Sequence, residues 1–278
     1  MDVVFRKASV YSTIAYYYFR RRFKQASRPF VHWNYSKKAG ERFEHLMGEI
    51  PSDKIFMHAG LSPLKRFTPG KDTYSYLKGL MFKHFKVVAS QGFTPSVRKT
   101  KVFDPEKERP AYGAFAKLFF RDASFRNLDP CYSVLAAGKA GFQEQAFSFS
   151  AEGPFRQMVE EDFYCINVGL DVFTCSLLHY IEYEQRVPYL EFFTDNYSIR
   201  REEQTEQIAY PIHTNKKGYS VKGYVWWNRQ RLMRDLKKSG LLSGEKIEGV
   251  RFWFFSMKKL YDFVSQKVKN DPYYLIKW

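Results

Sequence analysis

The sequence contains little cysteine: only Cys131, Cys165 and Cys175 occur among its 278 residues. Three irregularly spaced thiols do not form a disulfide framework, and no combination of cysteine and histidine has the spacing of a zinc site. Such sparse cysteine is typical of a chain in a reducing cytosol. We therefore expect a cytoplasmic protein with no bound metal.

Long apolar runs are also missing. The most apolar N-terminal stretch, residues 8–23, is interrupted by polar side chains and by Arg20, Arg21 and Arg22. It falls short of the roughly 20 apolar residues that a membrane-spanning helix needs. It also lacks the small-residue cleavage site of a signal peptide. We expect neither a transmembrane nor an exported form.

Aromatic residues and positive charge are abundant. The chain has 27 Phe, 20 Tyr and 5 Trp, and its 45 Lys and Arg against 29 Asp and Glu give a net charge of +16. This apolar bulk is enough for a packed core and excludes intrinsic disorder. The charge favours polyanionic partners, which could be nucleic acid, anionic lipid or phosphorylated metabolites.

Most of the positive charge lies in two regions. Residues 1–30 hold seven basic side chains and one acidic one, and residues 196–260 hold 14 basic and six acidic ones. Residues 16–24 interleave rings with cations, which suits an anionic membrane surface or a nucleic-acid groove, but also a peripheral helix with solvated arginines. No nucleic-acid motif accompanies the run, so nucleic acid is the least favoured partner. The membrane interpretation places the protein at the inner membrane face.

Strand and helix patterns alternate along the rest of the chain. Short apolar runs predict strands at residues 54–58, 87–90, 163–168 and 248–255, and apolar spacings of three and four predict helices at 36–47, 73–85, 114–120, 174–186 and 257–268. Alternation of this kind indicates an α/β fold, a layered domain with a central mixed sheet flanked by helices. We expect a basic arm at residues 1–30 and a single domain at 31–278. The long polar segment from residue 195 and the basic stretch after it form a predicted basic insertion, 195–245. We expect this insertion to shape the substrate-binding site.

One pair of side chains has the spacing of an acid–base unit. His179 and Glu182 are three residues apart on a predicted helix, so both fall on one helical face. A carboxylate that orients an imidazole and raises its basicity makes it a competent general base near neutral pH. A solvated surface pair is the alternative interpretation. The pair follows the carboxyl end of a predicted strand, where open α/β sheets gather their ligand sites, and this position favours catalysis.

Cys175 is a competing nucleophile, because it lies four residues before His179 and a helix could bring the two within reach. Sulfur chemistry requires an exposed thiol with a lowered pKa. The sequence shows neither property, so we interpret Cys175 as a packing residue.

Five segments, in order along the chain, resemble motifs of the aminoglycoside 3-N-acetyltransferase family, also called antibiotic N-acetyltransferases. They are residues 56–62 (FMHAGLS), 90–94 (SQGFT), 102–105 (VFDP) followed by Gly113, 126–138 (RNLDPCYSVLAAG), and 169–182, which contains His179 and Glu182. Two positions depart from the family pattern. Asp129 stands where the family frequently has histidine before proline, and residues 173–176 replace its frequent Asn-Thr.

The resemblance implies transfer of an acyl group, usually acetyl, from acyl-coenzyme A to an amine of an amino sugar. It implies that His179 deprotonates the amine and that Glu182 orients the imidazole. It also implies coenzyme A contacts for the turn His58, Ala59, Gly60, Leu61 and Ser62, for Thr94, and for Ser133 near the thioester. The residues expected on the acceptor side are Arg126, Asp129 and Asp171.

The net charge bears on which amine is acetylated. Aminoglycosides are polycations, and like charges slow capture. We therefore expect an anionic acceptor, a nucleotide- or lipid-linked amino sugar used in surface polysaccharide biosynthesis. Two alternatives are an aminoglycoside 3-N-acetyltransferase that confers antibiotic resistance, and an inactive family member that acts as a basic binding module. The oligomeric state is not indicated by the sequence.

Overall fold

A computed structural model describes residues 33–70, 72–216 and 227–277. The basic arm predicted at residues 1–30 lies outside the described residues. So does the central part of the predicted insertion, residues 217–226.

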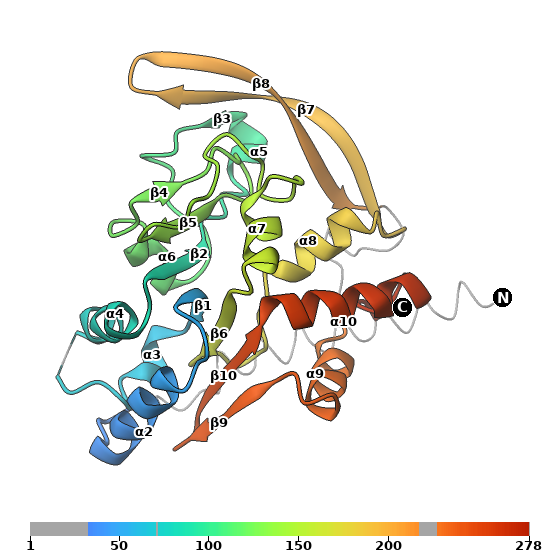
Figure 1. Cartoon of the computed structure of the whole chain (residues 1–278). Helices are drawn as coiled ribbons and strands as arrows, with labels where there is room; N and C mark the ends of the chain where they lie inside the picture. Colours follow the sequence, from blue (N-terminus) through green and yellow to red (C-terminus); the bar gives the residue numbers. More distant parts are fainter. Residues whose placement is uncertain (1–32, 71, 217–226, 278) are drawn as a thin grey trace, which may run out of the picture.

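The described chain folds around a seven-stranded mixed sheet with strand order β4-β5-β2-β1-β6-β10-β9 (Figure 1). Its three central strands are parallel, and the strands towards both edges run antiparallel to their neighbours. The strands are β1 (Lys54–Ala59), β2 (Val87–Gln91), β4 (Phe125–Arg126), β5 (Val134–Ala137), β6 (Tyr164–Val168), β9 (Ser243–Ile247) and β10 (Val250–Ser256). The predicted α/β layered fold is therefore confirmed.

Helices cover both faces of this sheet. β1 shows why, since Ile55 and Met57 belong to one buried apolar cluster and Phe56, on the opposite side of the strand, belongs to the other. The cluster of Ile55 is covered by α2 (Lys37–Gly48), α3 (Leu61–Leu64), α4 (Thr73–His84) and α6 (Ala114–Phe119). The cluster of Phe56 is covered by α7 (Pro154–Glu160), α8 (Leu177–Glu184), α9 (Arg229–Lys238) and α10 (Met257–Asn270). Of the helices in the described part of the chain, none is long and apolar enough to cross a membrane.

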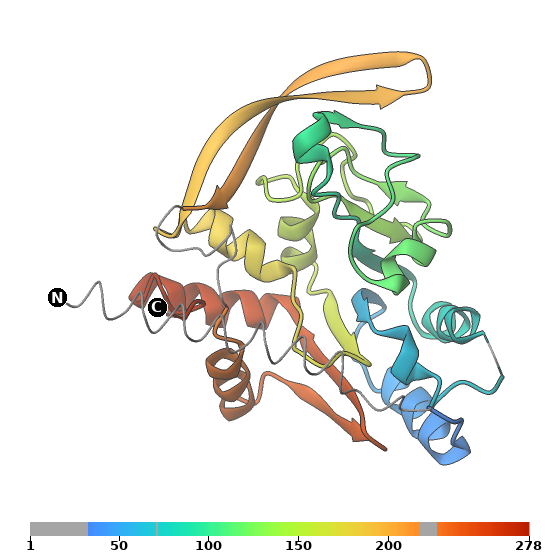
Figure 2. The same ribbon diagram turned by 180° about the vertical axis from the view of Figure 1, so that it is seen from behind.

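A long hairpin arches over one end of the molecule (Figures 1 and 2). It consists of β7 (Leu190–Arg201) and β8 (Gln204–Asn215), and β7 also pairs with the short strand β3 (Val102–Phe103), beside α5 (Val97–Thr100). Much of this hairpin lies in the predicted insertion, to which the sequence analysis assigned no strand. At its root Leu190 is buried, whereas farther along Tyr197 and Ile199 are buried. In β7, even-numbered side chains thus face the protein at the root and odd-numbered ones beyond it.

The carboxyl ends of β1 and β6 approach each other through two glycines. Gly60 donates its N–H to the Val168 carbonyl at 2.9 Å. A Cβ on Gly60 would lie 2.3 Å from the Gly169 oxygen, and one on Gly169 would lie 2.4 Å from the Gly60 oxygen. Gly169 also has φ = +65°, which disfavours any other residue. Only glycine at both positions allows the two strand ends to be this close.

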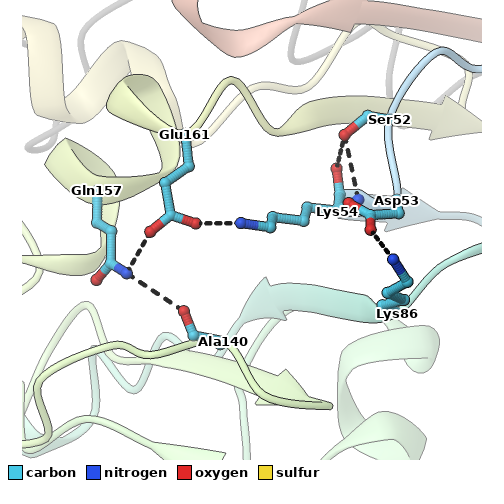
Figure 3. Close-up of polar contacts among 7 residues, drawn as sticks. All are labelled: Ser52, Asp53, Lys54, Lys86, Ala140, Gln157 and Glu161. Carbon is cyan, nitrogen blue, oxygen red and sulfur yellow. Dashed lines mark hydrogen bonds and ion pairs between the residues drawn. The ribbon is translucent and has the colours of Figure 1, made fainter.

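At the amino ends of the parallel strands the structure places a network of paired charges (Figure 3). Lys54 Nζ lies 2.6 Å from Glu161 Oε2, and Lys86 Nζ lies 2.8 Å from Asp53 Oδ2. Gln157 donates to the second oxygen of Glu161 at 2.7 Å. Each carboxylate in the network has a partner, and Lys86 is exposed while the other three charged side chains are partly exposed, so this end of the sheet carries structural contacts.

Candidate active site

The segment before α8 is tied to the carboxyl ends of all three parallel strands. The Ser176 N–H donates to Nε2 of His58 on β1 at 3.3 Å, and the Ser176 hydroxyl donates to Gln91 Oε1 at the end of β2 at 3.2 Å. Asn167 on β6 holds Thr174 through its side-chain amide, with bonds of 2.7 and 2.8 Å to the Thr174 backbone. These contacts fix where α8 begins, and they place its first turn at the end of the sheet where α/β folds bind ligands.

His179 and Glu182 meet on the first two turns of α8. His179 Nδ1 lies 3.3 Å from Glu182 Oε2, and the exposed fractions of the two side chains are 34% and 3%. The carboxylate is therefore buried while the imidazole reaches the surface. A solvated surface pair would have left both side chains exposed.

Glu182 is held by two further donors. Its Oε1 accepts the Tyr189 hydroxyl at 2.9 Å and the Trp227 indole N–H at 2.8 Å. Burial and the adjacent Glu182 carboxylate raise the pKa of Tyr189, so this hydroxyl keeps its proton and remains a donor. Hydrogen-bond donors on both oxygens offset the desolvation of a buried carboxylate.

Aromatic rings surround the His179 imidazole. The Trp227 ring centroid lies 4.7 Å away, and those of Phe93 and Tyr132 each lie 6.2 Å away. The root of the hairpin extends this wall, because His213 on β8 stacks on Tyr132 with centroids 5.1 Å apart. The rings limit the imidazole to few orientations and exclude water from its flanks.

Two other buried histidines lie near His179. Burial lowers the pKa of His58 to about 3 and that of His213 to about 3, and His179 acts on both in the same direction. Both are therefore neutral at physiological pH. His58 Nε2 accepts the Ser176 N–H, so the His58 proton sits on Nδ1. His58 and His213 thus serve as neutral hydrogen-bonding groups, and His179 is the partly exposed histidine among the three.

This arrangement suits a general base. A carboxylate at Nδ1 fixes the tautomer with its proton on Nδ1, which leaves the Nε2 lone pair for a substrate proton. The same carboxylate stabilises the imidazolium that forms once the proton is taken. A base positioned in this way typically contributes about 10²–10⁴-fold to a rate.

The turn predicted to contact coenzyme A lies next to α8. His58 and Ala59 are buried, Gly60 and Leu61 are partly exposed, and Ser62 is exposed. Through His58 the turn contacts the start of α8. It stays a candidate ligand-binding segment.

Thr94 and Ser133 are placed differently from what the resemblance implies. Both are fully buried. The Thr94 hydroxyl donates to the Pro130 carbonyl at 2.7 Å, and the Ser133 hydroxyl donates to the Gly92 carbonyl at 2.8 Å. These bonds join the loop after β2 to the loop before β5, and neither side chain has surface through which to contact a coenzyme.

Arg126 and Asp129, both predicted to bind substrate, are also inside the protein. Arg126 donates to the carbonyls of Pro105, Glu108 and Gly92 and to the Ser133 hydroxyl. The Asp129 carboxylate accepts bonds from three backbone N–H groups and from the Tyr210 hydroxyl. Burial lowers the pKa of Arg126 to about 10 and raises that of Asp129. Both side chains hold loops in place, and their expected part in substrate binding stays a prediction.

Asp171 is exposed in the turn after β6, and its backbone carbonyl accepts a bond from Arg251. Cys175 is buried, which agrees with its interpretation as a packing residue. Among the residues of known placement, no group of three or more His, Cys, Asp or Glu could hold a metal ion.

Tyr189, Trp227 and His213 were missed by the sequence analysis. Trp227 and His213 come from segments far from α8 in the chain, so no local spacing relates them to His179. Tyr189 is seven residues after Glu182, a helical spacing, but the helix ends at Glu184 and Pro188 follows.

The fold and the site together fit an α/β enzyme, with the carboxylate-held His179 as its candidate base. The family model of the aminoglycoside 3-N-acetyltransferases matches residues 84–269. The chain therefore belongs to the aminoglycoside 3-N-acetyltransferase family. The predicted resemblance is confirmed, as is the expected class of enzyme, a coenzyme A-dependent N-acyltransferase.

Solved structures of aminoglycoside acetyltransferases share this fold. AAC(3)-IIb has a TM-score of 0.68 at 13% identity, with 86% of this chain and 98% of that chain covered. AAC-VIa with bound sisomicin has a TM-score of 0.67 at 15% identity, covering 85% and 98%. AAC-IIIb in a binary complex with CoASH has a TM-score of 0.65 at 15% identity, covering 84% and 96%. Among curated proteins, none matches by sequence.

The comparisons support one of the expected acceptors more than the other. They support acyl transfer, and they favour the alternative expectation, an aminoglycoside 3-N-acetyltransferase, over a nucleotide- or lipid-linked sugar. The membrane contact expected for the arm has no support in them.

Proposed function

We propose that this protein transfers the acetyl group of acetyl-coenzyme A to an amine of an aminoglycoside-like amino sugar. The observation that carries the proposal is the contact between the half-exposed His179 and the buried Glu182, 3.3 Å apart, at the carboxyl end of the sheet. An inactive binding module would have no need to bury a carboxylate behind a reactive imidazole. Acetyl-coenzyme A supplies the activated acyl group when it is bound.

In this proposal His179 moves one proton. An ammonium has no lone pair, so the acceptor nitrogen must lose a proton before it forms a bond to the thioester carbon. His179 Nε2 takes that proton, while Glu182 stabilises the charged ring through Nδ1. The new C–N bond replaces the C–S bond, and the sulfur leaves with a proton as the coenzyme A thiol. No covalent intermediate with the protein is needed.

The net charge of +16 does not by itself exclude a cationic acceptor. The hairpin beside the site carries five acidic and two basic side chains between residues 190 and 215. Fields of exposed charges are screened over about 8–10 Å at physiological ionic strength, so groups near the site matter more than the total. Three of these acidic side chains, Glu202, Glu203 and Glu206, lie at the far end of the hairpin from the site, whereas Arg229 lies over the Trp227 ring and Arg98 and Arg186 act on His213. The charge around the site is therefore mixed, and the proposal of an aminoglycoside-like acceptor rests on the family match.

The test is an acetyl-transfer assay read by mass spectrometry. The full-length protein is incubated with acetyl-coenzyme A and, in separate reactions, with sisomicin, gentamicin and a nucleotide-linked glucosamine. We expect one acetyl group on an aminoglycoside and equimolar release of free thiol, both lost in His179→Ala and kept in the control His45→Ala, whose ring is exposed on α2. Equal turnover by wild type and His179→Ala would reject the mechanism. Acetylation of the nucleotide-linked sugar alone would reject the proposed acceptor.

A further inference from the structure

Two arginines lie on aromatic rings at the root of the hairpin, beside the candidate active site. The guanidinium carbon of Arg98 lies 5.5 Å from the ring centroid of Tyr132. That of Arg186 lies 4.5 Å from the ring centroid of Phe192 and 4.9 Å from that of Tyr183. Arg186 is exposed and Arg98 is partly exposed, so both side chains can be reached from solvent.

His213 connects the two arginines. Its ring centroid lies 5.1 Å from that of Tyr132 and 6.1 Å from that of Phe192, the rings that carry them. Arg98 also donates to the His213 carbonyl at 3.1 Å. Burial lowers the pKa of His213 to about 3, and His179 and both arginines act in the same direction. The catalytic imidazole and two cations therefore surround one buried, neutral ring.

Among the residues that the structure describes, neither arginine has a carboxylate within 4 Å. The hydrogen bonds of Arg98 go to neutral oxygens, those of the His213 carbonyl and the Tyr132 hydroxyl. Elsewhere arginines are commonly paired, as Arg42 is with Glu245 at 2.7 Å. A partly buried cation with only neutral partners is poorly compensated, and a ligand with an acidic group would supply the missing charge.

The acidic side chains at this end of α8 and β7 do not supply that charge. Glu182 and Glu184 already accept bonds from tyrosine hydroxyls, each at 2.9 Å. Glu191 is exposed, and successive side chains along a strand point to opposite faces, so it lies on the face of β7 opposite Phe192. The cations at the root of the hairpin are therefore left for an anionic ligand.

The base and the cations are separated by one aromatic ring. The ring centroid of Tyr132 lies 6.2 Å from that of His179, and Arg98 lies on the same tyrosine. A small molecule with its amine at His179 can therefore place an acidic group at the arginines. A phosphate suits them best, because a guanidinium donates two parallel hydrogen bonds to it and its three oxygens can serve two arginines at once.

We propose that the site also accepts amino sugars that carry a phosphate group, with the amine at His179 and the phosphate at Arg98 and Arg186. The inference rests on the proposed acetyl transfer and adds a second class of acceptor to the aminoglycoside-like one. Arg229, whose guanidinium carbon lies 5.8 Å from the Trp227 ring centroid, adds a third cation beside the catalytic pair. A polycationic acceptor gains nothing from these arginines, whereas a phosphorylated amino sugar uses both the base and the cations.

The experiment measures binding apart from turnover, with two sugars that differ only in the phosphate, glucosamine 6-phosphate and glucosamine. Titration calorimetry on the full-length protein should show that the phosphorylated sugar binds roughly 100-fold more tightly. Arg98→Gln and Arg186→Gln should each reduce this preference by roughly tenfold, because each removes one charge-assisted contact. The control Arg200→Gln removes the same charge from an exposed position far along β7 and should bind as wild type does.

Acetyl transfer gives a second readout. With glucosamine 6-phosphate, both variants should raise KM and leave kcat unchanged, because the arginines bind the phosphate and His179 moves the proton. With glucosamine, the variants should turn over as wild type does, and this result also shows that they are folded. If Arg98→Gln does not fold, Arg186→Gln carries the test, since among the described residues its exposed side chain contacts rings only.

The outcomes separate the two proposals. If wild type binds both sugars equally, or if Arg186→Gln binds the phosphorylated sugar as wild type does, the phosphate site is overturned, even when an aminoglycoside is acetylated. If no acceptor is acetylated but binding of glucosamine 6-phosphate still depends on Arg186, the proposed function fails and the phosphate site stands. If muramic acid, an amino sugar with a carboxylate, binds more tightly than glucosamine 6-phosphate, the assignment to a phosphate is overturned.

Discussion

The two ends of the central parallel strands use charge in opposite ways. At the amino ends, Lys54 forms an ion pair with Glu161 and Lys86 forms one with Asp53, all on partly or largely exposed side chains (Figure 3). At the carboxyl ends, the buried carboxylate of Glu182 is held by neutral donors and by one imidazole that reaches the surface. A partly exposed ion pair contributes little free energy, whereas a buried carboxylate behind a titratable ring can direct a proton. The difference favours the carboxyl ends of the strands as the place of the proposed chemistry.

The largest expected effect comes from removing the charge of Glu182 while keeping its shape. In Glu182→Gln the remaining oxygen can still accept from Tyr189 and Trp227, but the new amide N–H₂ faces His179 Nδ1. The ring then places its proton on Nε2 and loses its basic lone pair there. We expect kcat to fall by about 10²–10⁴-fold in a thiol-release assay, with little change in unfolding temperature.

The matched control for that variant is Glu184→Gln on the same helix, where the carboxylate accepts the Tyr180 hydroxyl at 2.9 Å. It should keep its kcat. A similar loss in both variants would mean that α8 is merely destabilised, and the distinct role of Glu182 would have to be abandoned.

The next effect concerns the glycine pair that closes the carboxyl ends of β1 and β6. Gly169→Ala forces a side chain into a left-handed backbone conformation and into the Gly60 carbonyl. We expect unfolding free energy to fall by about 1–3 kcal/mol, measured by urea denaturation. Gly79→Ala, in the middle of α4 with open space around its Cβ, should instead stabilise by about 0.4–1 kcal/mol. Equal effects of the two substitutions would contradict the close approach.

The buried histidines predict how stability depends on pH. His213 has a folded pKa of about 3 against about 6.5 when unfolded, so the unfolded chain binds its proton first. The stability contributed by the neutral ring is complete above pH 6.5 and is lost as the pH falls towards 3. In that window each such histidine contributes a slope of about 1.4 kcal/mol per pH unit. In His213→Gln, the slope of unfolding free energy against pH below pH 6.5 should be smaller by this amount, measured by urea titrations at several pH values. An unchanged slope would show that His213 is not held neutral.

The smallest effect is expected at the amino ends of the strands. Lys54→Gln breaks the ion pair with Glu161, and a partly exposed pair is worth about 1 kcal/mol or less. The unfolding free energy should change within that range and kcat should not change. A large fall in kcat would contradict the assignment of structural contacts to the amino ends and of chemistry to the carboxyl ends of the strands.

Strands and helices whose sequences have a regular apolar pattern could be predicted. β1 is a continuous apolar run buried on both faces, and α10 has a regular three- and four-residue apolar spacing. The β7–β8 hairpin was not predictable, because its buried side changes between Phe192 and Tyr197 as the ribbon passes from α8 to the region of α5 and β3. A strand that changes its buried side shows no steady alternation, and its exposed polar side chains resemble a loop.

Only the part of the candidate site that is formed by residues close together in the sequence could be predicted. His179 and Glu182 share one helical face, so spacing alone brings them together. The donors Tyr189 and Trp227 reach Glu182 through tertiary packing, for which spacing carries no signal. Ser133 shows a second limit of prediction from sequence. A serine that binds a ligand and a serine that bonds to a backbone carbonyl look the same in a sequence, and Ser133 bonds to a carbonyl.

The most direct test of the central claim is the single-turnover rate of acetyl transfer to an aminoglycoside amine at neutral pH, measured for wild type and His179→Gln under saturating acetyl-coenzyme A. The account predicts a rate about 10²–10⁴-fold lower in the variant, with the chain folded. The same rate in both proteins would contradict it.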